Sequence, residues 1–120
     1  MEVVNVDNIK AQMRKGILEY CILSILSKED AYVSSIINEL KESEMIIVEG
    51  TLYPLLTRLK NQDLLAYRWE ESNQGPPRKY YSITKKGDEV LQELDEAWDD
   101  LVSVIKNIRK KGSNTNTENQ

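Results

Sequence analysis

The stretch GTLYPLLTRLKNQ, residues 50–62, decides the fold of this 120-residue chain. Its leucines recur at helical spacing, which predicts a helix with one buried face. Thr51 is placed to cap the N-terminus of this helix, and Pro54 is expected in its first turn, where a missing N–H group is harmless. The buried face is predicted to consist of Leu52, Leu55, Leu56 and Leu59. The other side chains of the helix are therefore available to contact a partner.

Two further helices are predicted on the N-terminal side of this stretch. The first runs from about Asp7 or Asn8 to Ser27, and its apolar stripe is so wide that the helix must be buried on more than one side. The second covers YVSSIINELKE, residues 32–42, with apolar residues along one face. Three consecutive helices with a short connection before the last are typical of a helix-turn-helix.

A β-hairpin is predicted on the C-terminal side. LLAYRW, residues 64–69, alternates in the manner of a half-buried strand. SNQGPP, residues 72–77, contains one glycine and two prolines, which we expect to exclude regular structure. RKYYSIT, residues 78–84, returns as the second strand, and its Thr84 is placed to cap the next helix.

The last predicted helix runs from Lys85 to about Lys111. Six apolar residues in it follow alternating spacings of three and four, which is an a/d heptad seam: Leu91, Leu94, Trp98, Leu101, Ile105 and Ile108. A helix of this length, about 40 Å, is too long to be covered by the small domain before it. The seam therefore predicts a dimer interface, and the alternative is one long helix packed on its own domain.

The order of these elements predicts a winged helix-turn-helix of the mainly α (α+β) class, with a two-stranded wing and a long C-terminal dimerisation helix. The expected organisation is a DNA-binding domain over residues 1–84, a dimerisation helix over 85–111 and a disordered tail over 112–120. The tail contains no apolar residue, so it has nothing to bury.

Charge is distributed unevenly along the chain. The net charge is −4, but residues 49–86 carry seven basic and four acidic side chains, a local excess of three positive charges. In a winged helix-turn-helix these basic residues fall on the third helix and the wing, which are the elements that meet DNA. The alternative interpretation is a solvated surface with a chance asymmetry.

Composition excludes several classes of function. The chain has no histidine and one cysteine, Cys21, which removes histidine-dependent catalysis, cysteine-cluster metal sites and an intrachain disulfide. We therefore expect no enzyme activity, no metal and no cofactor, and Cys21 in its apolar run should be inert. No signal peptide is recognisable, and the longest apolar stretch, Ile17 to Leu26, is too short to span a bilayer. We expect a soluble cytoplasmic protein without membrane contact.

The strings GTLYPLLTRL and GPPRKYYSITKKG, followed by a long helix with a single tryptophan, resemble the PadR family of bacterial transcriptional regulators over residues 9 to 108. The single C-terminal helix is similar to the small subgroup that includes a lactococcal multidrug-responsive repressor. The resemblance implies a homodimeric repressor that binds a pseudo-palindromic operator and is released by a small molecule. It also implies DNA contacts, to which the basic character of the third helix adds Lys60: Tyr32, Ser35, Thr51, Tyr53, Pro54, Arg58, Lys60, Arg78 and Lys79.

The sequence departs from the family pattern at two places. Asp63 stands where the family usually has glycine after the third helix, so it must adopt the left-handed conformation, which Asp tolerates fairly well. Pro76 and Pro77 replace more flexible or basic wing residues, so the wing is expected to be stiffer and less charged.

The resemblance also implies an effector site at Trp98, where paired tryptophans of the subgroup sandwich flat aromatic compounds across the dimer. Four residues of the first helix align with the lining of that cavity: Met13, Gly16, Glu19 and Tyr20. Nearby carboxylates would favour a planar cationic aromatic effector. Two alternatives stay open: Trp98 is only a core anchor, and the whole protein is a dimeric protein–protein adaptor that does not bind DNA.

Overall fold

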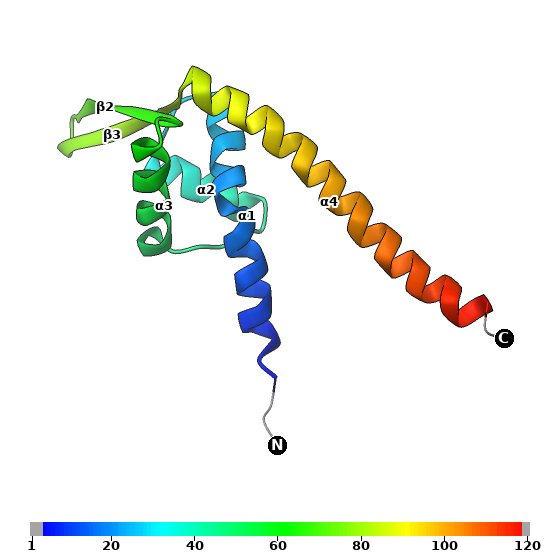
Figure 1. Ribbon diagram of the computed structural model, residues 1–120. Helices are drawn as coiled ribbons and strands as arrows, with labels where there is room; N and C mark the ends of the chain where they lie inside the picture. Colours follow the sequence, from blue (N-terminus) through cyan, green and yellow to red (C-terminus); the bar gives the residue numbers. More distant parts are fainter. Residues whose placement is uncertain (1–3, 119–120) are drawn as a thin grey trace.

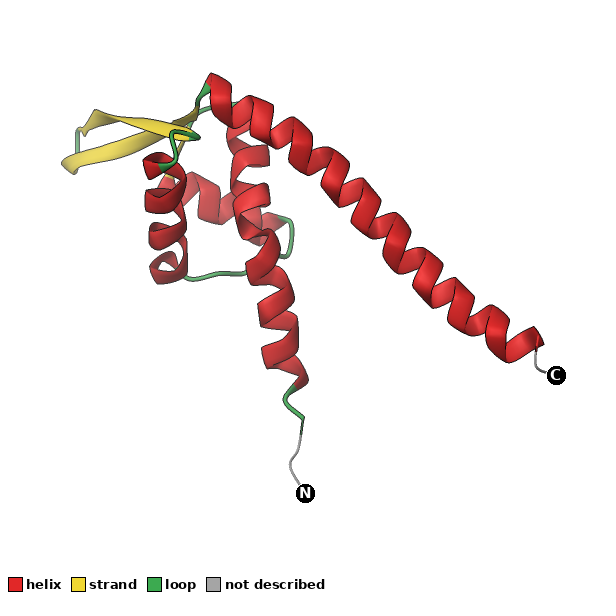
Figure 2. Cartoon of the chain, in the orientation of Figure 1, coloured by secondary structure: helices red, strands yellow, loops and turns green. Residues whose placement is uncertain are grey.

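The computed structural model describes the backbone of residues 4–118 and the side chains of residues 4–111 (Figure 1). The elements in this range follow in the order α1 (Val6–Lys28), β1 (Ala31–Tyr32), α2 (Val33–Glu42), α3 (Glu49–Asn61), β2 (Leu65–Ser72), β3 (Gly75–Ile83) and α4 (Lys85–Glu118). Figure 2 shows α1, α2 and α3 gathered beside a short sheet, with α4 leaving the domain as a long helix. The predicted mainly helical winged helix-turn-helix is confirmed.

The core lies between the first three helices and the sheet. Apolar residues of every one of these elements are buried in it, among them Ile22, Leu26, Ile36, Leu52, Leu56, Leu59, Leu65 and Tyr81. Only the second half of α1 contributes, since Val6, Ile9 and Met13 in its first half are exposed. Because the leucines of α3 point into the core, the opposite face of α3 points toward solvent.

Two helices end with a non-glycine residue in the left-handed conformation. Asp63 has φ 63° after α3, as the sequence predicted, and Glu44 has φ 67° after α2. After α3 the Leu64 N–H donates to the Leu59 carbonyl at 3.0 Å, which closes the helix with a hydrogen bond and an apolar contact. This termination directs the chain from α3 straight into the wing.

The beginning of α3 differs from the prediction. Val48 is the N-cap, with no side-chain hydrogen bond, and the helix starts at Glu49, so Thr51 lies inside it. Pro54 then falls in the second turn, where it cannot donate to the Gly50 carbonyl. Gly50 is an exposed residue, where a backbone carbonyl without a helical partner costs less than it would in the core. The sequence rule failed because no side chain caps this helix, which begins with backbone bonds from the Thr51 and Leu52 N–H groups to the Val48 carbonyl.

The sheet has three strands in the order β1-β3-β2, one more than predicted. The added strand β1 pairs Ala31 with Tyr81 and Tyr32 with Tyr80. Two residues are too few to produce an alternating pattern, so no local signal indicates this strand. Through β1 the start of α2 is joined directly to the base of the wing.

The wing is longer than predicted, because Gly75, Pro76 and Pro77 belong to β3 rather than to a loop. The turn consists of Asn73 and Gln74 only. Prolines are tolerated here because β1 reaches β3 only at Tyr80 and Tyr81, which leaves the outer edge of β3 unpaired toward the tip. The prolines themselves form a bulge in β3, because Glu70 pairs with Arg78 and Ser72 with Gly75, which places Pro76 and Pro77 opposite the single residue Glu71 of β2.

The junction between the wing and α4 is tightly packed. The Thr84 Oγ1 accepts the Gly87 N–H at 3.0 Å, which confirms Thr84 as the cap of α4. A Cβ atom on Gly87 would lie 2.2 Å from the Leu64 carbonyl oxygen. Glycine is therefore required here by a close approach of two backbone segments.

The helix α4 corrects two predictions. Leu91 is only 8% exposed and belongs to the core of its own domain, with Leu94 packed against it, so the first part of the predicted seam is already covered. Trp98, Leu101, Ile105 and Ile108 remain exposed. The helix also continues to Glu118, beyond the expected end at Lys111, and no proline interrupts it. The rest of the predicted tail, 119–120, lies outside the described residues.

Candidate nucleic-acid interface

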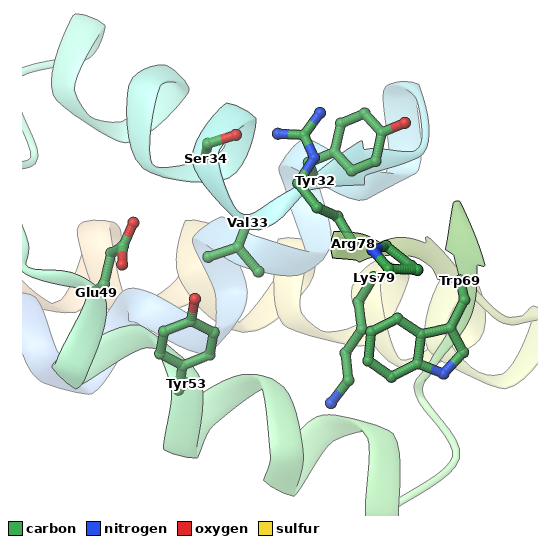
Figure 3. Close-up of a pocket in the computed structure, with 9 residues that line it drawn as sticks. Tyr32, Val33, Ser34, Glu49, Tyr53, Trp69, Arg78 and Lys79 are labelled. Atoms are coloured by element: carbon green, nitrogen blue, oxygen red, sulfur yellow. The ribbon is translucent and has the colours of Figure 1, made fainter. Parts of the chain in front are cut away.

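A hollow of about 450 Å³ lies between α2, α3 and the wing (Figure 3). Residues from all three elements line it: Tyr32, Val33, Ser34, Glu49, Tyr53, Trp69, Pro77, Arg78 and Lys79. Four of the residues predicted to contact DNA thus come together, namely Tyr32, Tyr53, Arg78 and Lys79. The outward face of α3 and the wing form one continuous concave surface.

The basic residues of the hollow are held by aromatic rings. The Arg78 guanidinium lies 4.0 Å from the centre of the Tyr32 ring, and the Lys79 Nζ lies 4.5 Å from that of Tyr67. The Nζ of Lys60 on α3 also lies over the Tyr67 ring, 5.9 Å from its centre. Cation–π contacts orient a charge without neutralising it. Within residues 4–111, none of these three cations forms an ion pair with a carboxylate, so their charge remains available to an anion.

Trp69 is a candidate that the sequence interpretation missed. The sequence analysis placed Trp69 in a half-buried strand and gave it no role, but Trp69 is 61% exposed and lines the hollow beside Lys79 (Figure 3). A large exposed aromatic next to a cation is typical of a binding surface. The signal available in the sequence was its position in the basic hairpin.

The remaining predicted DNA contacts lie outside the hollow. Ser35 is exposed on α2, whereas its neighbour Ser34 lines the hollow. Thr51 is half-buried and faces a groove beside α1. Pro54 lines a second, shallower groove along α3 with two residues that the prediction omitted, Thr57 and Asn61.

Arg58 is not free in the structure. It forms an ion pair with Glu19 of α1, although the sequence interpretation assigned these residues to two different sites. The Arg58 side chain is 60% exposed and the Glu19 side chain 25%. The predicted DNA contact and the predicted effector contact are therefore partners within one chain.

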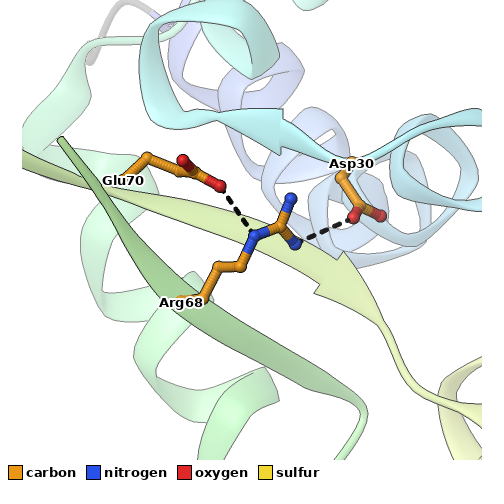
Figure 4. Close-up of polar contacts among 3 residues, drawn as sticks. All are labelled: Asp30, Arg68 and Glu70. Atoms are coloured by element: carbon orange, nitrogen blue, oxygen red, sulfur yellow. Dashed lines mark hydrogen bonds and ion pairs between the residues drawn. The ribbon is translucent and has the colours of Figure 1, made fainter. Parts of the chain in front are cut away.

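Arg68 connects the wing to the rest of the domain (Figure 4). Its Nε donates to Glu70 at 2.7 Å and its Nη1 donates to Asp30 at 3.3 Å, while the guanidinium covers the Tyr80 ring. Two carboxylates neutralise this arginine, so we assign it to fixing the wing rather than to binding an anion.

The residues predicted to bind an effector are only partly gathered. The Tyr20 hydroxyl donates to Asp95 at 2.6 Å, and its ring lies 6.3 Å from the Trp98 ring, centre to centre. The hydrogen bond to Asp95, with burial and nearby negative charge, raises the pKa of Tyr20 to about 12. Met13 and Gly16 are exposed on the first half of α1, and Glu19 points toward Arg58 instead.

Other classes of site have little support in the molecule. Within the part of the chain that the structure describes, no group of three potential ligands could hold a metal ion, and no helix combines the length and apolarity that crossing a bilayer requires. Cys21 is half-buried, and burial raises the pKa of its thiol, which lowers its reactivity.

Comparison with known proteins agrees with this architecture. A PadR-like transcription factor from Bacteroides fragilis is 61% identical over 84% of this chain and 98% of its own, with a TM-score of 0.73. A PadR family regulator from Eggerthella lenta is 35% identical over 86% and 90% of the two chains, with a TM-score of 0.80. Bacillus subtilis PadR in complex with operator DNA is 23% identical over 65% of this chain and 46% of its own, with a TM-score of 0.61, and so shares the fold.

The model of the transcriptional regulator PadR-like family matches residues 22–93, which extend from the second half of α1 through the wing into α4. This segment contains the whole three-stranded sheet, the helix α3 and the close contact at Gly87. From the match and the two similar structures we conclude that the chain belongs to the PadR-like family of transcriptional regulators, which are not enzymes.

Proposed function

We propose that this chain is a homodimeric transcriptional repressor that binds a pseudo-palindromic DNA operator with α3 in the major groove and the wing on the adjacent backbone. The observation that carries the proposal is the hollow, in which Arg78 and Lys79, without an ion pair among residues 4–111, lie beside the exposed rings of Tyr53 and Trp69. An α-helix fits the width of a major groove. The operator complex of Bacillus subtilis PadR, which has the same fold, supports DNA as the partner.

The two parts of this surface have different roles in the proposal. The cations of the wing contact phosphates, which gives affinity without sequence preference. Trp69 lies beside them and packs on the sugar–phosphate backbone. Tyr53 and the outward residues of α3, Thr57 and Asn61, reach base edges and give specificity.

Dimerisation is proposed through the exposed apolar surfaces of the two terminal helices. The residues Trp98, Leu101, Ile105 and Ile108 form a stripe on α4 that its own domain leaves exposed. The first half of α1 is exposed as well (Figure 1). Apolar surface of this extent indicates a protein partner, and a second copy of the chain would place two α3 helices on one operator.

An effector is proposed to bind near Trp98 at this dimer interface. Trp98 is 40% exposed, and its neighbourhood holds the Tyr20 ring and the carboxylates of Asp95 and Asp99. Flat aromatic cations match such a site. Binding that separates the helices would change the spacing of the α3 helices and release the operator.

The test of DNA binding is its salt dependence. DNA selected from a random library, together with the promoter of the protein's own gene, is titrated at several salt concentrations. Replacing Arg78 and Lys79 together with alanine removes two phosphate contacts from each protomer and four from the proposed dimer, so the salt slope should fall by about 4. Lys106→Ala with Lys110→Ala removes the same charge from exposed positions of α4 and should leave the slope unchanged. A wild-type protein without any salt-dependent DNA binding would instead be an adaptor.

A further inference from the structure

The ion pair between Glu19 and Arg58 joins the proposed DNA-binding helix to α1. Arg58 lines the groove along α3 that also contains Tyr53, Pro54 and Thr57. Tyr53 lines the hollow at the wing as well, so this groove continues the same surface. The guanidinium of Arg58 is thus at the edge of the proposed interface, on an exposed side chain.

The two partners of the pair differ in their surroundings. The Arg58 side chain is 60% exposed and can move away from the ion pair, whereas the Glu19 side chain is 25% exposed and projects from α1 toward α3. A guanidinium binds a carboxylate or a phosphate through the same forked N–H groups. Arg58 therefore cannot bind the Glu19 carboxylate and a phosphate through the same N–H groups at the same time.

We propose that Glu19 competes with DNA phosphate for Arg58, so that it sets the operator affinity from within the chain. This inference rests on the proposed DNA binding. In the free protein the carboxylate of Glu19 holds Arg58. In the complex a phosphate replaces that carboxylate, and the free energy of the broken ion pair is subtracted from the free energy of binding. Glu19 thereby keeps the complex weak enough to be released.

The experiment is a double-mutant cycle on DNA affinity. Glu19→Gln keeps the shape of the side chain and removes its charge, so operator binding should tighten about two- to fivefold for each protomer of the proposed dimer, the usual worth of one exposed ion pair. Arg58→Gln should weaken binding and reduce the salt slope by about 2, one for each protomer of the proposed dimer. Glu19→Gln combined with Arg58→Gln should bind no more tightly than Arg58→Gln alone.

The matched control is Glu49→Gln, which removes one negative charge from the first turn of α3. Glu49 is exposed, lines the hollow and forms no ion pair among residues 4–111. It reports how much the loss of any nearby carboxylate strengthens binding to a polyanion. If Glu19→Gln does not fold, as judged by circular dichroism, Glu19→Asp withdraws the carboxylate from Arg58 at constant charge and should also tighten binding.

Four results would overturn the proposal. Glu19→Gln could tighten binding equally with and without Arg58, or no more than Glu49→Gln, which would indicate simple charge repulsion. Glu19→Gln could leave the affinity unchanged and lower only the stability, as for a purely structural pair. Arg58→Gln could leave the salt slope intact, which would remove the phosphate contact. A wild type that binds no DNA would refute the proposed function itself, and the competition with it.

Discussion

Replacing Gly87 with alanine should destabilise the fold strongly, because the residue sits where α4 meets the chain leaving α3. The added Cβ would lie 2.2 Å from the Leu64 carbonyl oxygen and 2.7 Å from the Ile83 Cγ1. The carbonyl would have to retreat by roughly 1 Å to restore an ordinary contact. It accepts hydrogen bonds from the Thr84 N–H and the Thr84 hydroxyl, both at 3.1 Å, and such a shift would break both.

These contacts set the loss of unfolding free energy in Gly87→Ala. Two lost hydrogen bonds cost about 1 kcal/mol each, and overpacking adds about 1–3 kcal/mol. Alanine recovers about 1 kcal/mol because it favours the helix over glycine. The free energy of unfolding should therefore fall by about 2–4 kcal/mol.

The assay is urea unfolding followed by circular dichroism at one fixed protomer concentration, because dimerisation would make stability depend on concentration. Gly16→Ala is the control, since a Cβ on this helical glycine meets nothing within 4 Å. It should raise stability by up to about 1 kcal/mol. If Gly87→Ala loses less than about 1 kcal/mol, the contact with Leu64 does not require glycine and the reasoning is wrong.

Three other outcomes are expected. The hydrogen bond from the Tyr20 hydroxyl to Asp95 should stabilise the protein fully below pH 10, the ordinary pKa of tyrosine, and be lost as the pH rises toward about 12. The difference in unfolding free energy between wild type and Tyr20→Phe, measured by urea unfolding, should therefore vanish over that pH range. A difference that stays constant would contradict this expectation. Arg68→Ala should lower DNA affinity through a looser wing without changing the salt slope, whereas a reduced slope would make Arg68 a phosphate contact. Leu101→Glu combined with Ile105→Glu should abolish the dimer in sedimentation, because it places two charges in the proposed interface. The monomer should stay folded, since both side chains are exposed in the single chain. An intact dimer would place the interface elsewhere.

Much of the fold can be predicted from local patterns. The leucine spacing in residues 50–62 predicts the buried face of α3, and the left-handed Asp63 is expected from the place where the helix must end. Thr84 caps α4 as expected. These features are predictable because each depends on a few neighbouring residues, whose chemistry alone selects the conformation.

The errors come from contacts between distant segments. Pro76 and Pro77 lie in a strand because β1 stops short of them, and β1 itself is visible only through its pairing with β3. Leu91 continues the heptad spacing but is buried in the core of its own domain. A periodic pattern predicts that a face is buried, but the identity of the covering surface depends on the tertiary structure.

The same limit explains why the site was predicted only in part. Basic and aromatic residues on α3 and the wing predicted the surface around Tyr53, Arg78 and Lys79, since the fold dictates where these elements lie. Charge alone could not separate these cations from Arg68, which pairs with carboxylates 38 residues away and two residues away. Pairing across the structure decides which charges remain for a partner.

Two consecutive residues of α1 contact the proposed DNA-binding site and the proposed effector site. Glu19 holds Arg58 of α3, and Tyr20 holds Asp95 of α4 beside Trp98. Neighbouring side chains project about 100° apart around a helix, so α1 touches both sites through different faces. A rotation of α1 that accompanies an effector near Trp98 would alter the Glu19 contact as well. If the two sites are coupled in this way, linkage requires operator DNA to change the affinity for the effector by the same factor as the effector changes the affinity for DNA.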